Sequence, residues 1–163
     1  MVKRLPKKAI GWEEWVALPS IGLPAIKAKS DTGARSSSLH AFNIVPFQEE
    51  GLSYVRFNVN PLQKNNILTA ICTAPVKQRR FVTSSNGEKE RRYVITTEIV
   101  IGERKVKVDV TLTNRHKMAF RMLLGMDTIK KARLMVDPSL SCVVGKPDNP
   151  AELYRALNNK YTP

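Results

Sequence analysis

Cysteine and histidine are both scarce in this chain of 163 residues, which contains two of each. Cys72 and Cys142 lie in apolar runs, and one bridge would not make a disulfide scaffold, so we expect two free, buried thiols. A metalloprotease helix needs two histidines four residues apart with a glutamate between them. His40 and His116 do not have this spacing, so the sequence predicts no catalytic zinc site and no other metal site.

Long hydrophobic runs are missing as well, so no membrane-spanning helix is expected. Glu13 and Glu14 interrupt the apolar stretch that a secretory signal would need. No glycine-rich loop ends in Lys-Ser or Lys-Thr, and no Gly-x-Ser-x-Gly elbow marks a serine nucleophile. We therefore expect a cytoplasmic protein with no membrane partner and no cofactor.

Acidic residues are few, because 14 Asp and Glu stand against 27 Lys and Arg and leave a net charge of +13. A field of this sign concentrates anionic partners near the surface, whether nucleic acid, anionic membrane or acidic peptide. The cations are scattered along the chain, and no single run is typical of a nucleic-acid-binding arm. Charge alone therefore leaves the class of partner open.

The remaining composition predicts one mostly β domain. Its length and its 42% hydrophobic content fit a domain at 12–146, between a basic segment at 1–11 and a tail at 147–163. A short helix is expected at 127–133, with Asp127 as its N-cap, and the tail has the pattern of a second helix at 151–158. Alternating or apolar runs between turn residues predict the strands. These strands are 12–18, 23–30, 38–47, 52–59, 67–75, 94–101, 104–113, 134–137 and 140–144.

Residues 77–93 predict a separate hairpin centred on Ser84, Ser85, Asn86 and Gly87. Asn-Gly is the strongest short-range hairpin signal, because type I′ turns need positive φ at both central residues. The arms carry few apolar side chains, so the hairpin should project from the domain and move. It is either a solvated surface hairpin or a flap over a cleft.

The most distinctive stretch is 29–36, which reads Lys-Ser-Asp-Thr-Gly-Ala-Arg-Ser. Asp31 ends the apolar run at 23–28 and is followed at once by Thr32 and Gly33, which places a carboxylate on a tight turn after a strand. Two such carboxylates facing each other would share a proton and activate water. This is the chemistry of peptide hydrolysis.

A second signal is Leu123-Leu124-Gly125, which precedes the expected short helix. Together with Asp31-Thr32-Gly33-Ala34 and the hairpin between them, this order resembles the retropepsins, the single-domain aspartic proteases typified by retroviral proteases. Residues 28–41 and Leu124-Gly125-Met126-Asp127 are similar to a bacterial retropepsin-like family whose older label is ATP-dependent zinc protease. The similarity covers roughly Trp12 to Gly145.

The resemblance implies an acid-protease barrel and a homodimer, because each chain supplies only one Asp-Thr-Gly and the second Asp31 must come from another copy. It makes Asp31 the catalytic carboxylate, with Thr32 bonding across the two-fold axis and Gly33 letting the substrate approach. Leu123 to Gly125 would support the Asp31 turn. The flap at 84–87 would close over the peptide.

Two positions depart from the retroviral pattern. Arg35 stands where those enzymes have Asp, and Met126-Asp127 stands where they have Arg-Asn. We infer an Arg35–Asp127 ion pair with reversed charges; the alternative is that Asp127 only caps its helix. Ala34 and Arg35 are also candidate substrate contacts. The long interval before Leu123 predicts extra strands at 47–75.

Two functions remain open. The first is a homodimeric aspartic endopeptidase in which water activated between two Asp31 carboxylates attacks a peptide bond. Relatives of the resembled family are often associated with ligases that add glutamate tails, so acidic or polyglutamylated proteins are the expected substrates. The second is a non-catalytic basic module that keeps the fold and binds nucleic acid, ribosomes or another anionic partner.

Overall fold

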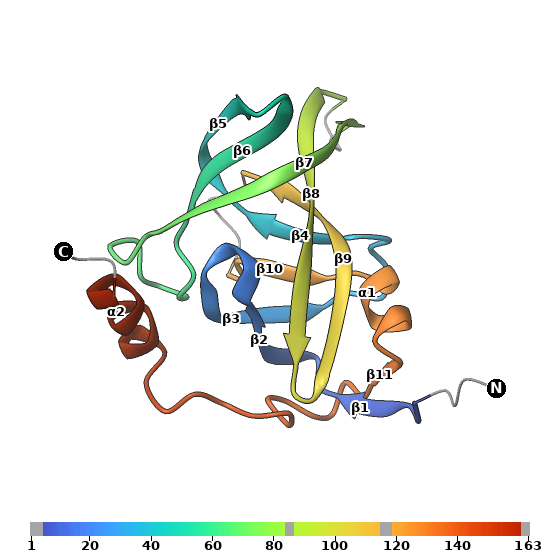
Figure 1. Ribbon diagram of the computed structural model, residues 1–163. Coiled ribbons are helices and arrows are strands. Elements are labelled where there is room, and N and C mark those ends of the chain that lie inside the picture. Colours follow the sequence, from blue (N-terminus) through green and yellow to red (C-terminus); the bar gives the residue numbers. More distant parts are fainter. Residues whose placement is uncertain (1–4, 84–86, 115–118, 161–163) are drawn as a thin grey trace.

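Six strands close into a mixed barrel in the computed structural model, which describes residues 5–83, 87–114 and 119–160 (Figure 1). A pairing of Ala17 with Val100 joins the first barrel strand to the last. This architecture confirms the predicted all-β class. The order around the barrel is β2 (Glu13–Leu18), β3 (Leu23–Ser30), β10 (Met122–Leu124), β4 (Ser37–His40), β9 (Arg104–Thr113) and β8 (Lys89–Ile101).

Three further strands extend the sheet beyond the barrel: β5 (Phe42–Glu49), β6 (Leu52–Val59) and β7 (Ala70–Thr83). The first half of β7 pairs with β6 and its second half pairs with β8. The β5–β6 and β7–β8 hairpins therefore rise together from one end of the barrel (Figure 1). The strand predicted at 38–47 is in fact β4 and β5, and the one predicted at 67–75 is the beginning of the longer β7.

Period-two alternation explains why these segments are strands. Val55, Phe57 and Val59 point into the core from β6, while the residues between them are more exposed. In β9, Val108 and Val110 are buried and Lys107 faces solvent. One apolar face on each strand is what lets a sheet curl around a single core.

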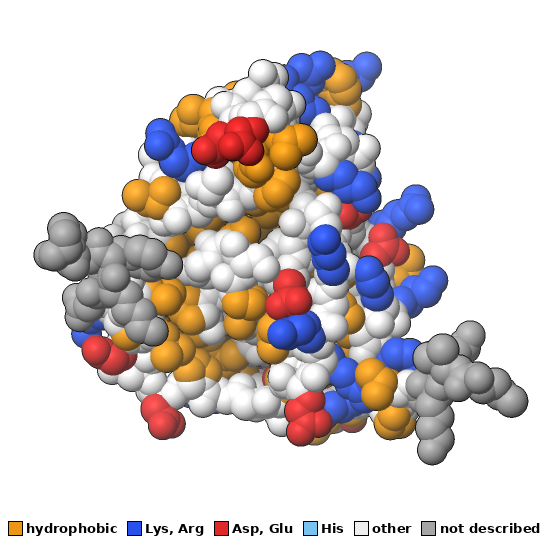
Figure 2. Space-filling model, viewed as in Figure 1, with side chains coloured by type: hydrophobic (Ala, Val, Ile, Leu, Met, Phe, Trp, Pro, Cys, Tyr) orange, Lys and Arg blue, Asp and Glu red, His pale blue; other side chains and the backbone are white. Residues whose placement is uncertain are grey.

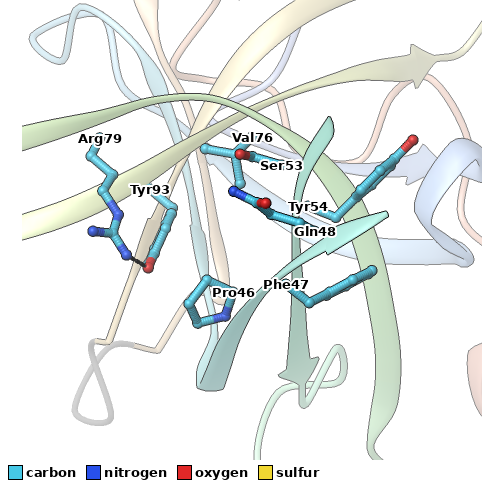
Figure 3. Close-up of a pocket in the computed structure, with 8 residues that line it drawn as sticks. All are labelled: Pro46, Phe47, Gln48, Ser53, Tyr54, Val76, Arg79 and Tyr93. Atoms are coloured by element: carbon cyan, nitrogen blue, oxygen red, sulfur yellow. Dashed lines mark hydrogen bonds between the residues drawn. The ribbon is translucent and has the colours of Figure 1, made fainter. Parts of the chain in front are cut away.

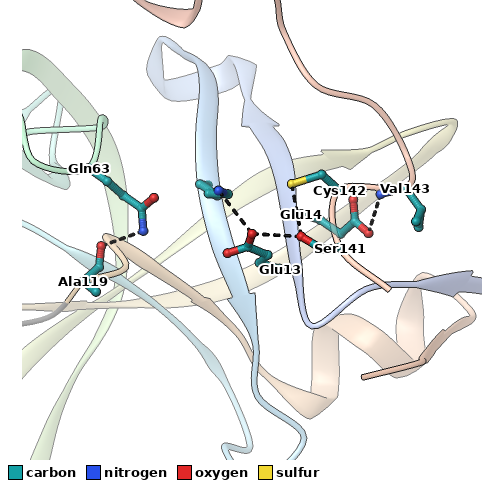
Figure 4. A network of polar contacts seen from close by, with 8 residues as sticks. Glu13, Glu14, Gln63, Ala119, Ser141, Cys142 and Val143 are labelled. Atoms are coloured by element: carbon teal, nitrogen blue, oxygen red, sulfur yellow. Dashed lines mark hydrogen bonds and ion pairs between the residues drawn. The ribbon is translucent and has the colours of Figure 1, made fainter. Parts of the chain in front are cut away.

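The ends of the domain are held by one buried carboxylate. Glu14 is 0% exposed and accepts hydrogen bonds from the backbone N–H groups of Gly11 (2.7 Å) and Val144 (3.2 Å). It also accepts the N–H of Val143 (3.1 Å), as Figure 4 shows. These charge-assisted bonds satisfy donors that would otherwise need a strand partner. The strand predicted at 140–144 is wrong, because this segment binds Glu14 instead of joining a ladder.

The remaining elements are short. β1 (Lys8–Ile10) pairs in parallel with β11 (Leu134–Val136), and the 3-10 helix η1 (Pro19–Ile21) joins β2 to β3. The helices are α1 (Met126–Lys131) and α2 (Pro150–Lys160), close to the two predicted. Neither is long and apolar enough to cross a membrane, and these are the two α-helices of the described residues.

The two helices differ in how they are fixed. The N-cap of α1 is Gly125, so the prediction that Asp127 caps this helix is wrong. Asp127 lies in the first turn of α1, where its negative charge still complements the helix dipole. The α2 helix packs on the barrel through Tyr154, whose buried hydroxyl donates to the carbonyl oxygen of Ala25.

Both cysteines are free thiols, as predicted, but only Cys72 is buried and Cys142 is half-buried. Burial raises the pKa of the Cys72 thiol to about 12. Because the thiolate is the reacting form, the two cysteines should differ strongly in reactivity.

We expect iodoacetamide at pH 8 to modify Cys142 and to leave Cys72 unmodified, as read by intact mass and peptide mapping. The Cys142→Ser variant should take up no label while folded and one label in denaturant. Rapid labelling of two thiols in the folded wild type would contradict the buried position of Cys72.

Candidate active site

The β3 strand delivers Asp31 to the surface at one end of the barrel. Its backbone N–H donates to the carbonyl oxygen of Leu124 at 2.9 Å, which extends the pairing of β3 with β10 by one residue. Its Oδ1 accepts the N–H groups of Gly33 (3.0 Å) and Ala34 (3.2 Å). The carboxylate therefore orders its own turn while Thr32 and Gly33 stay exposed.

The β10 strand lies between β3 and β4, parallel to the first and antiparallel to the second. The segment at 31–36 leaves β3 and enters β4, so it passes around the end of β10. Leu123, Leu124 and Gly125, which the sequence analysis assigned to support the site, are therefore directly behind the Asp31 turn.

Gly125 contacts the backbone of the Asp31 loop too closely for any side chain. A Cβ atom at this position would lie 2.3 Å from the carbonyl carbon of Ser36 and 2.7 Å from the nitrogen of Ser37. The N–H of Gly125 donates to Ser37 Oγ at 3.0 Å, and this oxygen is 2.6 Å from Thr128 Oγ1. Both hydroxyl side chains are fully buried, so the loop and α1 are joined by a satisfied polar network.

Ser37 and Thr128 are the functional-site residues that sequence reasoning missed. Ser37 Oγ accepts the N–H of Gly125, which lies 88 residues further along the chain. A serine at the start of a strand and a threonine in a first helical turn are both common. Their pairing follows only from the packing of α1 against β4.

The predicted Arg35–Asp127 ion pair is not formed within the described chain. The contact is between backbones instead: the N–H of Asp127 donates to the carbonyl of Arg35 at 2.9 Å, and the N–H of Met126 donates to that of Ala34 at 2.7 Å. These two bonds clip the beginning of α1 to the Asp31 loop. Arg35 is exposed and its side chain faces solvent.

An aromatic pair borders the site. The carbonyl of Trp12 accepts the N–H of Ser30 at 2.8 Å, one residue before Asp31. The Trp12 ring meets the edge of Phe120 with centroids 5.8 Å apart, and 39% of Trp12 remains exposed. Ser30 Oγ also donates to the carbonyl of Gly11 at 2.9 Å. The sequence analysis gave neither ring a role at the site.

The β7–β8 hairpin has the predicted position. Ser84, Ser85 and Asn86 lie outside the described residues, and Gly87 is exposed with the positive φ of 83° that the turn prediction requires. At the base of the hairpin, Lys77 Nζ contacts Asp109 Oδ2 at 2.5 Å. Partial burial raises the pKa of Asp109, but hydrogen bonds from Lys77 and Thr96 outweigh this and hold it below its ordinary value.

Across 5–83, 87–114 and 119–160, no three His, Cys, Asp or Glu side chains lie close enough together to share an ion.

The sequence profile of one family matches residues 9–147, and its description is "RimB-like: Retropepsin-like aspartic endopeptidase RimB". This chain belongs to that family. The resemblance inferred from the Asp31 and Gly125 motifs is therefore confirmed, and with it membership of a family of aspartic endopeptidases.

The solved structure of the protein Lpg0085 from Legionella pneumophila, described as of unknown function (DUF785), has the same fold. Its TM-score is 0.71 at 28% sequence identity, over 84% of this chain and 98% of that one. The predicted retropepsin-like barrel is thus confirmed at the level of fold.

Two curated relatives carry the name "Probable alpha-L-glutamate ligase". The protein from Shewanella pealeana is 47% identical over 140 residues, which is 86% of this chain and 30% of the relative. The protein from Desulfotalea psychrophila is 42% identical over 146 residues, 90% of this chain and 31% of the relative. This chain therefore spans less than a third of the length of these relatives.

We expect Gly125→Ala to destabilise the fold by about 2–3 kcal/mol, because the new methyl must displace the backbone at 36–37. Gly33→Ala is the matched control, since its Cβ would lie 3.3 Å from Asp31 Oδ1 in an exposed turn, and should cost about 0.5 kcal/mol. Urea unfolding followed by fluorescence measures both. Equal losses in the two variants would contradict the close contact at Gly125.

Proposed function

We propose that the protein is a homodimeric aspartic endopeptidase in which the Asp31 carboxylates of two copies activate one water molecule. The supporting observation is the state of Asp31 itself. Two backbone N–H groups fix one carboxylate oxygen, whereas Oδ2 has no hydrogen-bond partner in the described part of the chain. The side chain is thus oriented by its own turn and has one oxygen available for a reaction.

One chain supplies one such carboxylate, and a water-activating pair needs two. The exposed turn at Thr32 and Gly33 allows a second copy to approach along a two-fold axis, with Thr32 of each chain contacting the partner's turn. Trp12 and Met126, whose backbones bond Ser30 and Ala34 next to this turn, are 39% and 41% exposed. Such an interface would cover both apolar side chains.

Two Asp31 carboxylates held close together cannot both ionise at low cost, so the pair keeps one proton and titrates as a unit. The ionised member takes a proton from the bound water, which attacks the peptide carbonyl. The protonated member donates a hydrogen bond to the carbonyl oxygen as negative charge develops there. Gly33 leaves room for the substrate backbone beside the pair, and Ala34 and Arg35 flank it.

The β7–β8 hairpin fits the role of a flap in this dimer. It projects from the barrel with few apolar side chains at its far end, which lets it move relative to the core (Figure 1). Closure of this hairpin over a bound peptide would exclude water from the reaction.

Acidic or polyglutamylated proteins are the proposed substrates. The net charge of +13 attracts such chains. The relatives that contain a matching segment are named as glutamate ligases, which links this sequence with glutamate chemistry in longer proteins.

We expect Asp31→Asn to lower kcat by about a thousandfold or more, because the amide cannot serve as general base. An equal mixture of wild type and Asp31→Asn that exchanges subunits should retain about a quarter of the activity of the same amount of wild type, since only pure wild-type dimers are active. Peptide-library cleavage measures both.

Asp127→Asn is the matched control and should keep its activity, because Asp127 contacts the loop through its backbone. A mixture that retains half of the activity would show that each chain acts alone. Inactive wild type that still binds an anionic partner would instead favour the non-catalytic module.

The substrate preference gives a separate prediction. For peptides that differ only in Glu or Gln beside the cleaved bond, we expect kcat/KM to be about tenfold higher for Glu at low salt. The advantage should shrink in about 1 M salt, where the Debye length falls to about 3 Å. A preference for Gln, or one that salt leaves unchanged, would contradict charge-based selection.

A further inference from the structure

A cavity of about 420 Å³ opens between the β5–β6 and β7–β8 hairpins, and we call it the hairpin groove (Figure 3). All four strands of the two hairpins contribute to its lining, and none of the lining residues belongs to the Asp31 turn, β10 or α1. Its volume lies in the range of small-molecule sites. The proposed peptidase chemistry makes no use of it.

Aromatic rings stand on both sides of the hairpin groove (Figure 3). Phe47 and Tyr54 are cross-strand neighbours in β5 and β6, and their rings stack with centroids 5.5 Å apart and planes 17° apart. On the other side, the guanidinium of Arg79 lies 4.5 Å from the centroid of the Tyr93 ring and donates a hydrogen bond to the Tyr93 hydroxyl. The hydrogen bond keeps the guanidinium beside this ring.

The same pattern repeats one step toward the hairpin tip. Phe81 is opposite Arg91, whose guanidinium lies 5.0 Å from the Phe81 ring centroid. Because side chains two residues apart on a strand share a face, Phe81 follows Arg79, and Arg91 follows Tyr93, on one surface. Phe81 is 65% exposed, so this ring is available to a ligand.

The charge on this surface has one sign. The positions on the same face of the hairpin as Arg79 and Tyr93 are 79, 81 and 83 of β7 and 89, 91 and 93 of β8, and they hold three cations and no carboxylate. Glu90 alternates onto the opposite surface, where it pairs with Arg92 at 3.3 Å. Figure 2 shows Lys and Arg side chains gathered along the edge of the molecule formed by these strands.

We infer that the hairpin groove binds single-stranded nucleic acid. Bases would stack on Tyr93 and Phe81, and phosphates would contact Arg91 and Lys89, which is how sequence-tolerant strand binders combine rings with a positive groove. Gln48 and Ser53, exposed on the wall of the cavity, offer an amide and a hydroxyl to base edges.

The alternation of rings and guanidinium groups is what favours a nucleic acid over an acidic peptide. A carboxylate-rich chain would be satisfied by the cations alone and would leave the rings of Tyr93 and Phe81 unused. A nucleotide chain offers a flat base for each ring and a phosphate for each cation. The inference does not depend on peptidase activity, because the groove shares no residue with the Asp31 turn.

The test is fluorescence anisotropy on the full chain with labelled oligouridylate and oligothymidylate of about 12 nucleotides, at about 50 mM salt. We expect Tyr93→Leu and Phe81→Ser each to weaken binding about tenfold, and Tyr93→Phe to bind within about twofold of wild type. Arg79→Lys, which keeps the charge but loses the planar group, should weaken binding about threefold.

Lys105→Gln is the matched control, since Lys105 is an exposed cation at the opposite end of the β8–β9 pair, and it should bind within about twofold of wild type. Phe81→Ser changes an exposed side chain, so it remains informative if Tyr93→Leu unfolds. Preference for RNA over DNA, or the reverse, would identify the natural strand and support the site.

Three results would overturn the inference. One is the absence of binding at low salt. Another is equal loss in Lys105→Gln and Phe81→Ser, which would mean that charge alone attracts the strand. The last is a polyglutamate peptide of equal charge that binds as tightly and with the same sensitivity to Phe81→Ser, which would assign the groove to acidic peptides.

Discussion

The close contact between Gly125 and the backbone at 36–37 is the constraint on which the rest of the structure depends. It allows β10 to lie between β3 and β4, which closes the barrel and places the Leu124 carbonyl where it accepts the N–H of Asp31. The buried hydroxyls of Ser37 and Thr128 then fix α1 against the same loop. The barrel core and the orientation of the Asp31 carboxylate thus both depend on the contact at Gly125. A substitution of Gly125 therefore affects the stability of the fold and the geometry of the site together.

Sequence reasoning could find the elements whose signal is local. An apolar run placed β3 and alternation placed β6 at their observed bounds, and the turn residues located the β7–β8 hairpin. The Asp31 and Leu124-Gly125 motifs were sufficient to identify the family, because each is a short segment whose backbone geometry requires particular residues. The wrong strand at 140–144 has a non-local cause. The segment has the composition of a strand, but the N–H groups of Val143 and Val144 bond the Glu14 side chain, which is more than a hundred residues away in the chain.

The errors at Arg35 and Asp127 have a related origin. Arg35 favours ion pairing and Asp127 favours helix capping, and both predictions were based on these side-chain preferences. In the structure the backbone takes precedence, because Gly125 must contact Ser36 and therefore occupies the N-cap position itself. Asp127 is therefore the second residue of α1, and its N–H donates to the carbonyl of Arg35 where a side-chain pair was expected. Local propensity is a weak guide where a tertiary contact determines the register.

The β7–β8 hairpin has a role in both proposals, as a flap over the Asp31 pair and as one wall of the hairpin groove. A hairpin with few apolar side chains gains little from burial, so its order beyond the barrel rests on cross-strand pairs such as Arg79–Tyr93 and Phe81–Arg91. These are also the groups that would contact a nucleic acid. Any ligand that stacks on them must stiffen the hairpin, and a stiffened hairpin is a slower flap. The two proposals therefore couple the hairpin groove to the Asp31 turn through this one element, although the two sites share no residue.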